Sequence, residues 1–212
     1  MGFSVFLLVL VISRASSQNL SVFEVPVVRV GNNQPFIPAV NLGVGTPPQN
    51  ILFLLDSGSS DLWVPQSNSS LCKDRNQQCS GSPFVTGSFD PSKSTSLATV
   101  QANGPFFTNY VNGVSVNGTF ITESLQFGAK TAPKSQIGFS TTGVLPPPSP
   151  LFPIAGLGYP SFEGIIQLNQ QPYPNVIAGM KASGMIKSAS FAMYLNDFRM
   201  SQLPIFPYMA LN

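Results

Sequence analysis

The sequence predicts a mostly β protein with one or two short helices, because short apolar runs alternate with turn residues along much of the chain. Apolar residues appear in alternation over 22–30 and 40–44, as on strands with one buried face. Residues 51–55 are apolar without a break, which is typical of a strand buried on both faces. A further short buried strand is expected at 62–64. Hydrophobic residues make up 43% of the chain, so we expect a packed core.

A β-hairpin is predicted around Asn112-Gly113, a dipeptide that strongly favours a tight turn. Runs with strand character flank it at 106–110 and 114–122. Shorter runs at 125–127 and 137–139 continue the predicted sheet.

Two segments carry loop signals instead. Residues 66–105 are rich in Ser, Asn, Gly and Pro, and we expect a surface excursion rather than core. The Pro-rich stretch 145–153 is expected to form a loop or a polyproline II segment.

One helix is predicted near the end of the chain. Asn175 is a suitable N-cap, and Gly184 suits the position past the last turn. Three apolar residues would share one helix face: Val176, Ile177 and Met180. Beyond the helix, alternation at Phe191, Met193 and Leu195 predicts a final strand.

The composition excludes several classes of function. The formal net charge is +2 without a basic cluster, which argues against a nucleic-acid partner. The chain has no histidine and two cysteines, so it lacks Ser-His-Asp and Cys-His nucleophile systems and the usual ligand sets of zinc. We expect no metal or other cofactor, and an enzyme of this composition would use carboxylates for proton transfer. The eight carboxylates are Glu24, Asp56, Asp61, Asp74, Asp90, Glu123, Glu163 and Asp197.

The N-terminus has the pattern of an export signal. Residues 3–12 form an uncharged apolar run, and the small residues Ser13 and Ala15 follow on either side of Arg14. This pattern predicts a signal peptide at 1–17, with a buried helix as the alternative, and the run is shorter than the about 20 residues of a membrane span. A secreted, extracellular protein is predicted, with the cell wall or vacuole as other destinations. Residues 18–35 would be a short pro-piece or the mature N-terminus.

Export predicts two kinds of covalent modification. Asn19, Asn68 and Asn117 begin sequons for N-glycosylation, although such tripeptides also arise by chance. Cys72 and Cys79 bracket a short polar loop, and in an oxidising compartment we expect a disulfide rather than two free thiols.

Asp56 is the leading catalytic candidate. It directly follows the apolar run 51–55 and opens the turn Ser57-Gly58-Ser59-Ser60. The amides and hydroxyls of this turn would hydrogen-bond the carboxylate and fix its orientation. The alternative is an aspartate that only caps the turn.

The residues around Asp56 resemble the pepsin-like aspartic proteases (peptidase A1), because GTPPQ, the apolar run, DSGSS and DLWVP follow one another over 45–65 as in that family. Later motifs keep the family order: the two-cysteine loop, FDPSKST at 89–95, YVNG at 110–113, IAGLGY at 154–159 and the stretch 173–196. Departures are Ser57 where the family usually has Thr, and Val111 and Pro153 where Gly is commoner. The resemblance covers 36–197 and implies the N-terminal lobe, a β-barrel or sandwich with one or two short helices.

The resemblance also implies roles for individual residues. Asp56 would be one of two carboxylates that share a proton and activate water, and Ser59 would hydrogen-bond it. Tyr110 and Gly113 would form the flap that covers a protein or peptide substrate. Trp63 would support Tyr110 through its indole N–H. The alternatives are a core tryptophan and a cross-strand tyrosine.

The mechanism requires a second carboxylate, and Asp-Ser/Thr-Gly occurs only once in the sequence. Residues 198–212 form a tail that does not resemble the family's continuation, so we expect a truncated chain. The predicted function is an aspartic endopeptidase completed by a second lobe or by a homodimer. The alternative is an inactive secreted half that binds peptides as a decoy.

Overall fold

A computed structural model of the chain describes residues 22–30, 37–73, 79, 86–144, 153–168, 170–195 and 208–212. The expected signal peptide and the sequon at Asn19 lie outside these ranges, as do residues 145–152 of the Pro-rich stretch and residues 198–207 of the tail.

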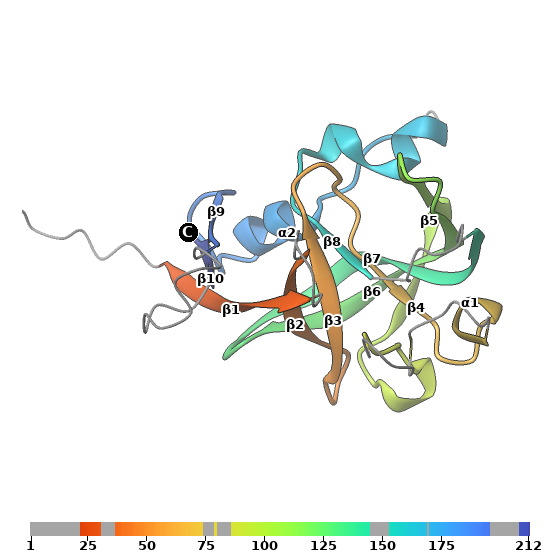
Figure 1. Ribbon diagram of the computed structural model, residues 1–212, viewed down its shortest axis with the longest axis horizontal. Helices are drawn as coiled ribbons and strands as arrows, with labels where there is room; N and C mark the ends of the chain where they lie inside the picture. The colour runs from red at the N-terminus through yellow and green to blue at the C-terminus, as the bar shows by residue number, and fades with distance from the viewer. Residues whose placement is uncertain are drawn as a thin grey trace, which may run out of the picture.

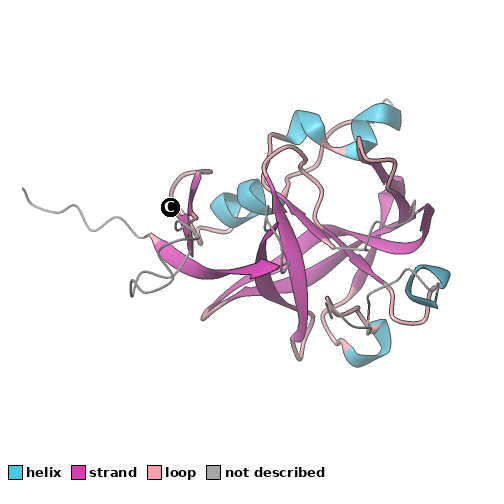
Figure 2. Ribbon diagram, in the orientation of Figure 1, coloured by secondary structure: helices cyan, strands magenta, loops and turns pink. Residues whose placement is uncertain are grey.

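The fold is mostly β, as predicted (Figures 1 and 2). The strands are β1 Phe23–Val30, β2 Ile37–Val44, β3 Gln49–Asp56, β4 Trp63–Pro65, β5 Ala98–Asn109, β6 Ser115–Phe127, β7 Lys130–Val144, β8 Ile154–Gly156, β9 Phe191–Tyr194 and β10 Tyr208–Leu211. The α-helices are α1 Ser70–Lys73 and α2 Val176–Ala182. The 3₁₀ helices are η1 Pro91–Lys93, η2 Pro160–Phe162 and η3 Gly164–Leu168.

Strand β2 joins the two halves of the sheet. It pairs antiparallel with β3 along most of its length. It also pairs with β1 in its first half and with β6 at Gly43 and Val44. Strand β6 continues the sheet through antiparallel pairing with β5 and β7. Two parallel pairs, β3 with β8 and β4 with β7, bring distant segments beside the loop that follows β3.

The core has two main parts. The larger part includes Val40, Ile51, Phe53 and Leu125, and none of these side chains is exposed. The second lies around Trp63 and contains an edge-to-face aromatic series, in which the Phe106 and Phe120 ring centroids are 5.3 Å apart and those of Phe120 and Tyr173 are 5.1 Å apart. This second part lies under the hairpin formed by β5 and β6.

The hairpin prediction is confirmed. The turn between β5 and β6 has Gly113 at φ 83°, a conformation that favours glycine. The Tyr110 N–H donates to the Val114 carbonyl oxygen at 2.8 Å, and the Asn112 side chain accepts from the Val114 N–H at 3.1 Å. Val111 is fully exposed at the tip.

The helix prediction is also confirmed. The Asn175 side chain accepts from the Ala178 N–H at 3.0 Å and caps α2. Val176, Ile177 and Met180 are buried on one face, and Gly184 follows the helix at φ 73°.

The expectation for residues 66–105 is wrong in part. Phe89 is fully buried, packs edge-to-face on Phe139 and exchanges backbone hydrogen bonds with Pro65 and Ser67. Strand β5 also begins at Ala98, well inside this polar segment. Long-range pairing with β6 provides the strand partner that the local composition does not indicate.

Strand β3 is less enclosed than its apolar sequence suggests. Ile51, Phe53 and Leu55 are buried, whereas Leu52 and Leu54 are only partly buried against a small cluster that contains Val30 and Ala39. Buried and partly buried residues alternate along β3 because one face of the strand packs against the main core and the other packs against this smaller cluster.

The expected final strand at 191–195 is not the last one. Strand β9 covers Phe191–Tyr194, and Leu195 lies outside it. Strand β10 follows within the tail and pairs antiparallel with both β9 and β1, which places Met209 and Leu211 in the core. In the described part of the chain, no helix is long and apolar enough to cross a membrane.

Candidate active site

Asp56 is the last residue of β3 and is held by its own turn. Its Oδ1 accepts from the Gly58 N–H at 2.8 Å, and its Oδ2 accepts from the Ser59 hydroxyl at 2.6 Å. The residue is half-buried, and Ser57 and Gly58 beside it are exposed. The carboxyl group is therefore oriented by two donors while it remains open to a partner from outside.

Strand β8 and the residues after it hydrogen-bond to this turn. It runs parallel to the end of β3, with Asp56 opposite Gly156. The Leu157 N–H donates to the Asp56 carbonyl oxygen at 2.8 Å, and the Gly158 N–H donates to the Ser59 carbonyl oxygen at 2.8 Å. A Cβ atom on Gly156 would lie 2.5 Å from the carbonyl carbon of Ser60, so only glycine permits this approach.

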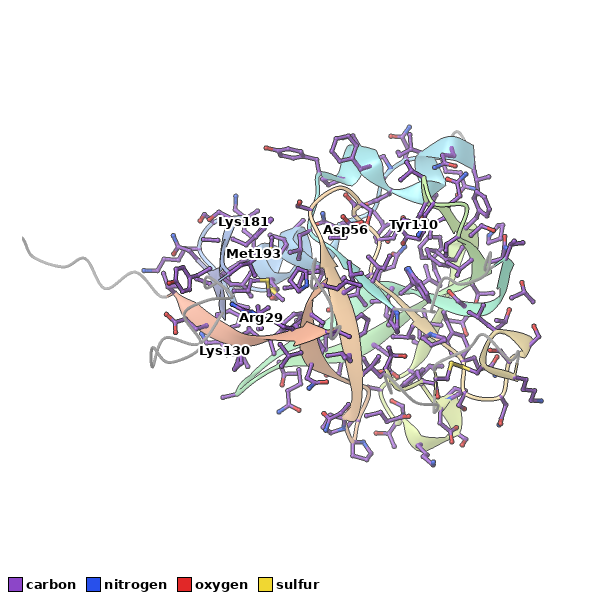
Figure 3. All side chains as sticks on the ribbon, viewed as in Figure 1. Arg29, Asp56, Tyr110, Lys130, Lys181 and Met193 are labelled. Atoms are coloured by element: carbon purple, nitrogen blue, oxygen red, sulfur yellow. A yellow bond between two sulfur atoms is a disulfide. The ribbon has the colours of Figure 1, made fainter. Side chains whose placement is uncertain are left out.

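The flap contact expected from the resemblance is present. The Trp63 indole N–H donates to the Tyr110 hydroxyl oxygen at 2.8 Å, and Trp63 is fully buried. Figure 3 shows Tyr110 and Asp56 toward the same end of the molecule. Tyr110 is partly exposed as a residue, but burial of its hydroxyl raises its pKa well above the usual value, and the Trp63 hydrogen bond opposes this shift.

A second acidic group lies inside the lobe. Asp61 is fully buried, and its side chain accepts from the Gly164 N–H and from the Tyr173 hydroxyl, both at 2.7 Å. The Thr108 hydroxyl lies close enough to interact with Asp61. Burial raises the pKa of Asp61, and the hydrogen bonds from Gly164, Tyr173 and Thr108 act in the opposite direction.

Glu163 belongs to the same interior group. It is 2% exposed, and its Oε2 accepts from the Tyr173 N–H at 2.9 Å. Its Oε1 is buried without a hydrogen-bond partner among the described residues. Burial, with a smaller contribution from the negative charge of Asp61, raises the pKa of Glu163 to about 8.

Sequence reasoning gave no role to Asp61, Glu163 or Tyr173. The available signal was an acidic residue beside an apolar run, as in Asp61-Leu62-Trp63 and in Glu163-Gly164-Ile165. In the described part of the chain, no cluster of three or more His, Cys, Asp or Glu side chains suits a metal ion.

Residues 39–204 match the family model described as eukaryotic aspartyl protease. The chain belongs to this family. It is 37% identical over 163 residues to "Probable aspartic-type endopeptidase opsB" of Aspergillus fumigatus, a match that covers 74% of this chain and 30% of that protein. It is 30% identical to "Secreted aspartic protease 3" of Candida albicans, with 78% of this chain and 38% of that protein covered.

A solved structure shows the same fold. The aspartic proteinase from Irpex lacteus superposes with a TM-score of 0.64 at 19% sequence identity, covering 90% of this chain and 47% of that protein. The chain thus spans about a third of the length of the curated aspartyl proteases that it matches.

The aspartyl protease lobe has an apolar pocket beside Asp56. Its volume is about 460 Å³, and it is lined by Ser57, Leu157, Tyr159, Phe162, Ile177 and Phe191 among others. Tyr159 and Phe162 are 76% and 56% exposed, and their rings pack edge-to-face with centroids 6.4 Å apart. Large aromatic side chains with this exposure are typical of a surface that another protein segment covers.

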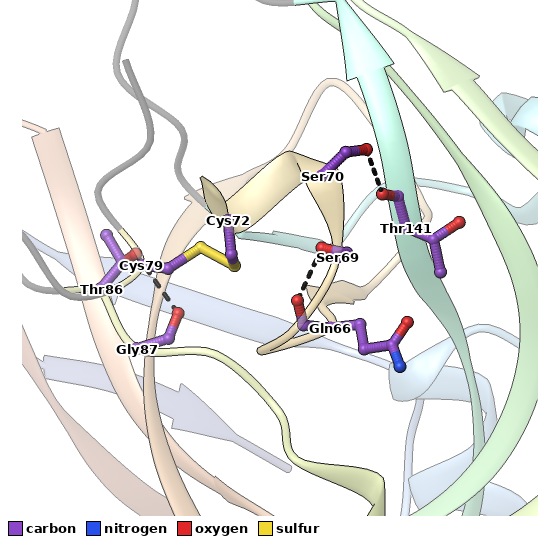
Figure 4. The surroundings of a disulfide bond; sticks show 8 residues. All are labelled: Gln66, Ser69, Ser70, Cys72, Cys79, Thr86, Gly87 and Thr141. Carbon is purple, nitrogen blue, oxygen red and sulfur yellow. Dashed lines mark hydrogen bonds between the residues drawn. A yellow bond between two sulfur atoms is a disulfide. The ribbon is translucent and has the colours of Figure 1, made fainter. Parts of the chain in front are cut away.

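The disulfide between Cys72 and Cys79 is present (Figure 4). The Ser70 hydroxyl donates to the Thr141 carbonyl oxygen at 3.1 Å and so ties α1 to β7. Asn68 is exposed, and Asn117 is partly buried within β6, where it pairs with Phe107 of β5. Glycosylation at Asn19, Asn68 and Asn117 stays a prediction.

Proposed function

We propose that this chain provides the Asp56-bearing lobe of an aspartic endopeptidase. The geometry of Asp56 carries the proposal, because its carboxyl group receives two hydrogen bonds from its own turn while the residue stays partly exposed. These two donors fix the orientation of the carboxyl group. An oriented carboxylate of this kind takes a proton from an attacking water, while a second, protonated carboxyl group polarises the scissile carbonyl.

The flap defines the substrate class in this proposal. Tyr110 and Gly113 lie at the turn between two long antiparallel strands, and Trp63 fixes the Tyr110 hydroxyl. An extended peptide between this turn and Asp56 would be covered and partly shielded from water. Protein or peptide substrates are therefore the expected class.

The second carboxyl group has to come from outside this lobe, because the sequence contains a single Asp-Ser/Thr-Gly motif. The apolar surface with Tyr159 and Phe162 lies beside Asp56 and suits the contact that would bring this group close. A second lobe of a longer protein and a second copy of this chain are the two sources.

We propose an extracellular location, with the cell wall or vacuole as other destinations. The apolar run at 3–12 and the disulfide between Cys72 and Cys79 support export into an oxidising compartment. The word "secreted" in the name of the similar Candida albicans protein points the same way.

The test is cleavage of an unstructured protein by the purified chain at about pH 4, where a carboxyl group of ordinary pKa is partly protonated. Asp56→Asn is compared with Asp90→Asn, a matched change at an aspartate that caps η1. We expect cleavage that rises with the square of the chain concentration if two copies form the site, and that Asp56→Asn alone removes. Cleavage at the same measurable rate by wild type and Asp56→Asn would overturn the proposal. Absence of cleavage by both would exclude a site formed by two copies and leave a second lobe of a longer protein or the decoy alternative.

A further inference from the structure

The interior carboxyl group of Asp61 connects the catalytic turn with three distant elements. It accepts from the Gly164 N–H of η3 and from the Tyr173 hydroxyl before α2, and it interacts with the Thr108 hydroxyl of β5. Thr108 also interacts with the Tyr110 hydroxyl, which in turn accepts from the Trp63 indole. A continuous set of polar contacts therefore leads from Asp61 to the flap tyrosine.

Helix η3 packs directly on strand β5, which leads to Tyr110 and is called the flap strand below. A Cβ atom on Gly164 would lie 2.1 Å from the Phe107 carbonyl oxygen and 3.1 Å from the Thr108 Cα. The Gln167 amide donates to the Asn109 side-chain oxygen at 3.1 Å. A displacement of η3 away from Asp61 would therefore be transmitted to β5 and to the turn that carries Tyr110.

We propose that Asp61 is a positioning residue that links the turn of Asp56 to the flap strand β5, and that a proton on Glu163 keeps this link closed. The proposal rests on the proposed roles of Asp56 and Tyr110. Asp61 touches neither substrate nor water in this scheme and acts only through Thr108 and Gly164.

In this proposal Glu163 controls the contact between Gly164 and Asp61, because it is the residue directly before Gly164. The Gly164 N–H donates to Asp61, and the Glu163 Oε2 accepts from the Tyr173 backbone. Within the part of the chain that the structure describes, the groups that interact electrostatically with Glu163 are Asp61 and Tyr173, and Tyr110 interacts with Tyr173. None of these groups carries positive charge.

Ionisation of Glu163 would therefore place a second negative charge beside Asp61 in the interior. Asp61 has two donors and is the better site for the first charge. Glu163 has one donor and a buried oxygen without a partner among the described residues. The charged Glu163 would move toward water and pull Gly164 away from Asp61.

Trp63 reports directly on this link. It is the single tryptophan of the chain, it is fully buried, and its indole donates to Tyr110. Its fluorescence therefore depends on the position of the flap tyrosine and does not require proteolytic activity. Failure of the cleavage test would leave this measurement intact, so the two proposals can be separated.

The experiment is a pH titration of Trp63 emission in the purified chain. We expect a change in emission with a midpoint near pH 8, the pKa of Glu163, while the far-ultraviolet circular dichroism stays constant. Glu163→Gln should keep the acid-form spectrum throughout the titration. Asp61→Asn should lower the midpoint by removing the neighbouring negative charge.

The matched control is Glu123→Gln. Glu123 is also fully buried, but its two oxygens accept from the Ser94 and Ser96 hydroxyls at 2.6 and 2.5 Å. This variant should leave the midpoint unchanged. An unchanged transition in Glu163→Gln, or a loss of circular dichroism with the same midpoint, would overturn the proposal, since the second result would mean general unfolding.

Discussion

Asp56 and Asp61 lie on the same loop, yet the fold treats them in opposite ways. Asp56 is half-buried and takes its hydrogen bonds from Gly58 and Ser59, its neighbours in sequence. Asp61 is fully buried and takes its hydrogen bonds from Gly164 and Tyr173, more than a hundred positions away. The hydrogen bonds of half-buried Asp56 stay within its own turn, so the proposed chemistry does not depend on distant contacts, whereas the hydrogen bonds of buried Asp61 join distant parts of the fold.

The contact between Gly164 and β5, near Asp61, gives the largest expected change in stability. Gly164→Ala would place a Cβ atom 2.1 Å from the Phe107 carbonyl oxygen, so η3 or β5 has to move. We expect a loss of about 3 kcal/mol in the free energy of unfolding, measured by urea titration. Gly179→Ala is the control, because nothing lies within 4 Å of its added Cβ and alanine favours the helix. Equal stability of the two variants would contradict the packing of η3 on the flap strand.

The pH dependence of stability distinguishes the interior around Asp61 and Glu163 from the turn of Asp56. The pKa of Glu163 in the folded chain, about 8, lies above the ordinary value of a glutamate. Its contribution to stability is therefore complete below about pH 4.5 and is lost as the pH rises toward 8. We expect the free energy of unfolding to fall by about 2.5 kcal/mol between pH 5 and pH 7.

Glu163→Gln should remove this slope, while Glu24→Gln, at an exposed glutamate on β1, should retain it. A slope that survives in Glu163→Gln would assign the pH dependence to other groups.

The hydrogen bond between Trp63 and Tyr110 gives the smallest expected change in stability. Tyr110→Phe removes the hydroxyl that accepts from the Trp63 indole, and the buried indole N–H then lacks its acceptor. We expect a loss of about 1 kcal/mol in the free energy of unfolding and a shift in Trp63 emission. Tyr194→Phe, at a partly exposed tyrosine of β9, should leave the emission unchanged. An unshifted spectrum in Tyr110→Phe would argue against the contact.

The features predicted from sequence are those that local chemistry determines. The end of β3 at Asp56, the turn at Asn112-Gly113 and the cap at Asn175 each depend on residues within one or two turns of chain. The resemblance added the Trp63–Tyr110 contact, which no local pattern indicates.

The features that sequence reasoning missed depend on long-range contacts. Phe89 lies in a polar segment and is buried by partners on β4 and β7. Strand β10 becomes part of the sheet through pairing with β1, near the other end of the chain. Glu163 and Tyr173 resemble ordinary loop residues until the fold brings them to Asp61.

The most direct test of the contrast between the two aspartates is the free energy of unfolding of Asp56→Ala and Asp61→Ala, measured by urea titration at pH 5. Asp56→Ala frees the N–H of exposed Gly58 and the hydroxyl of buried Ser59, and we expect a loss of about 1 kcal/mol. Asp61→Ala leaves the Gly164 N–H and the Tyr173 hydroxyl buried without their acceptor, and we expect a loss of about 3 kcal/mol. Equal losses, or a larger loss for Asp56→Ala, would contradict the division between an aspartate for chemistry and an aspartate for structure.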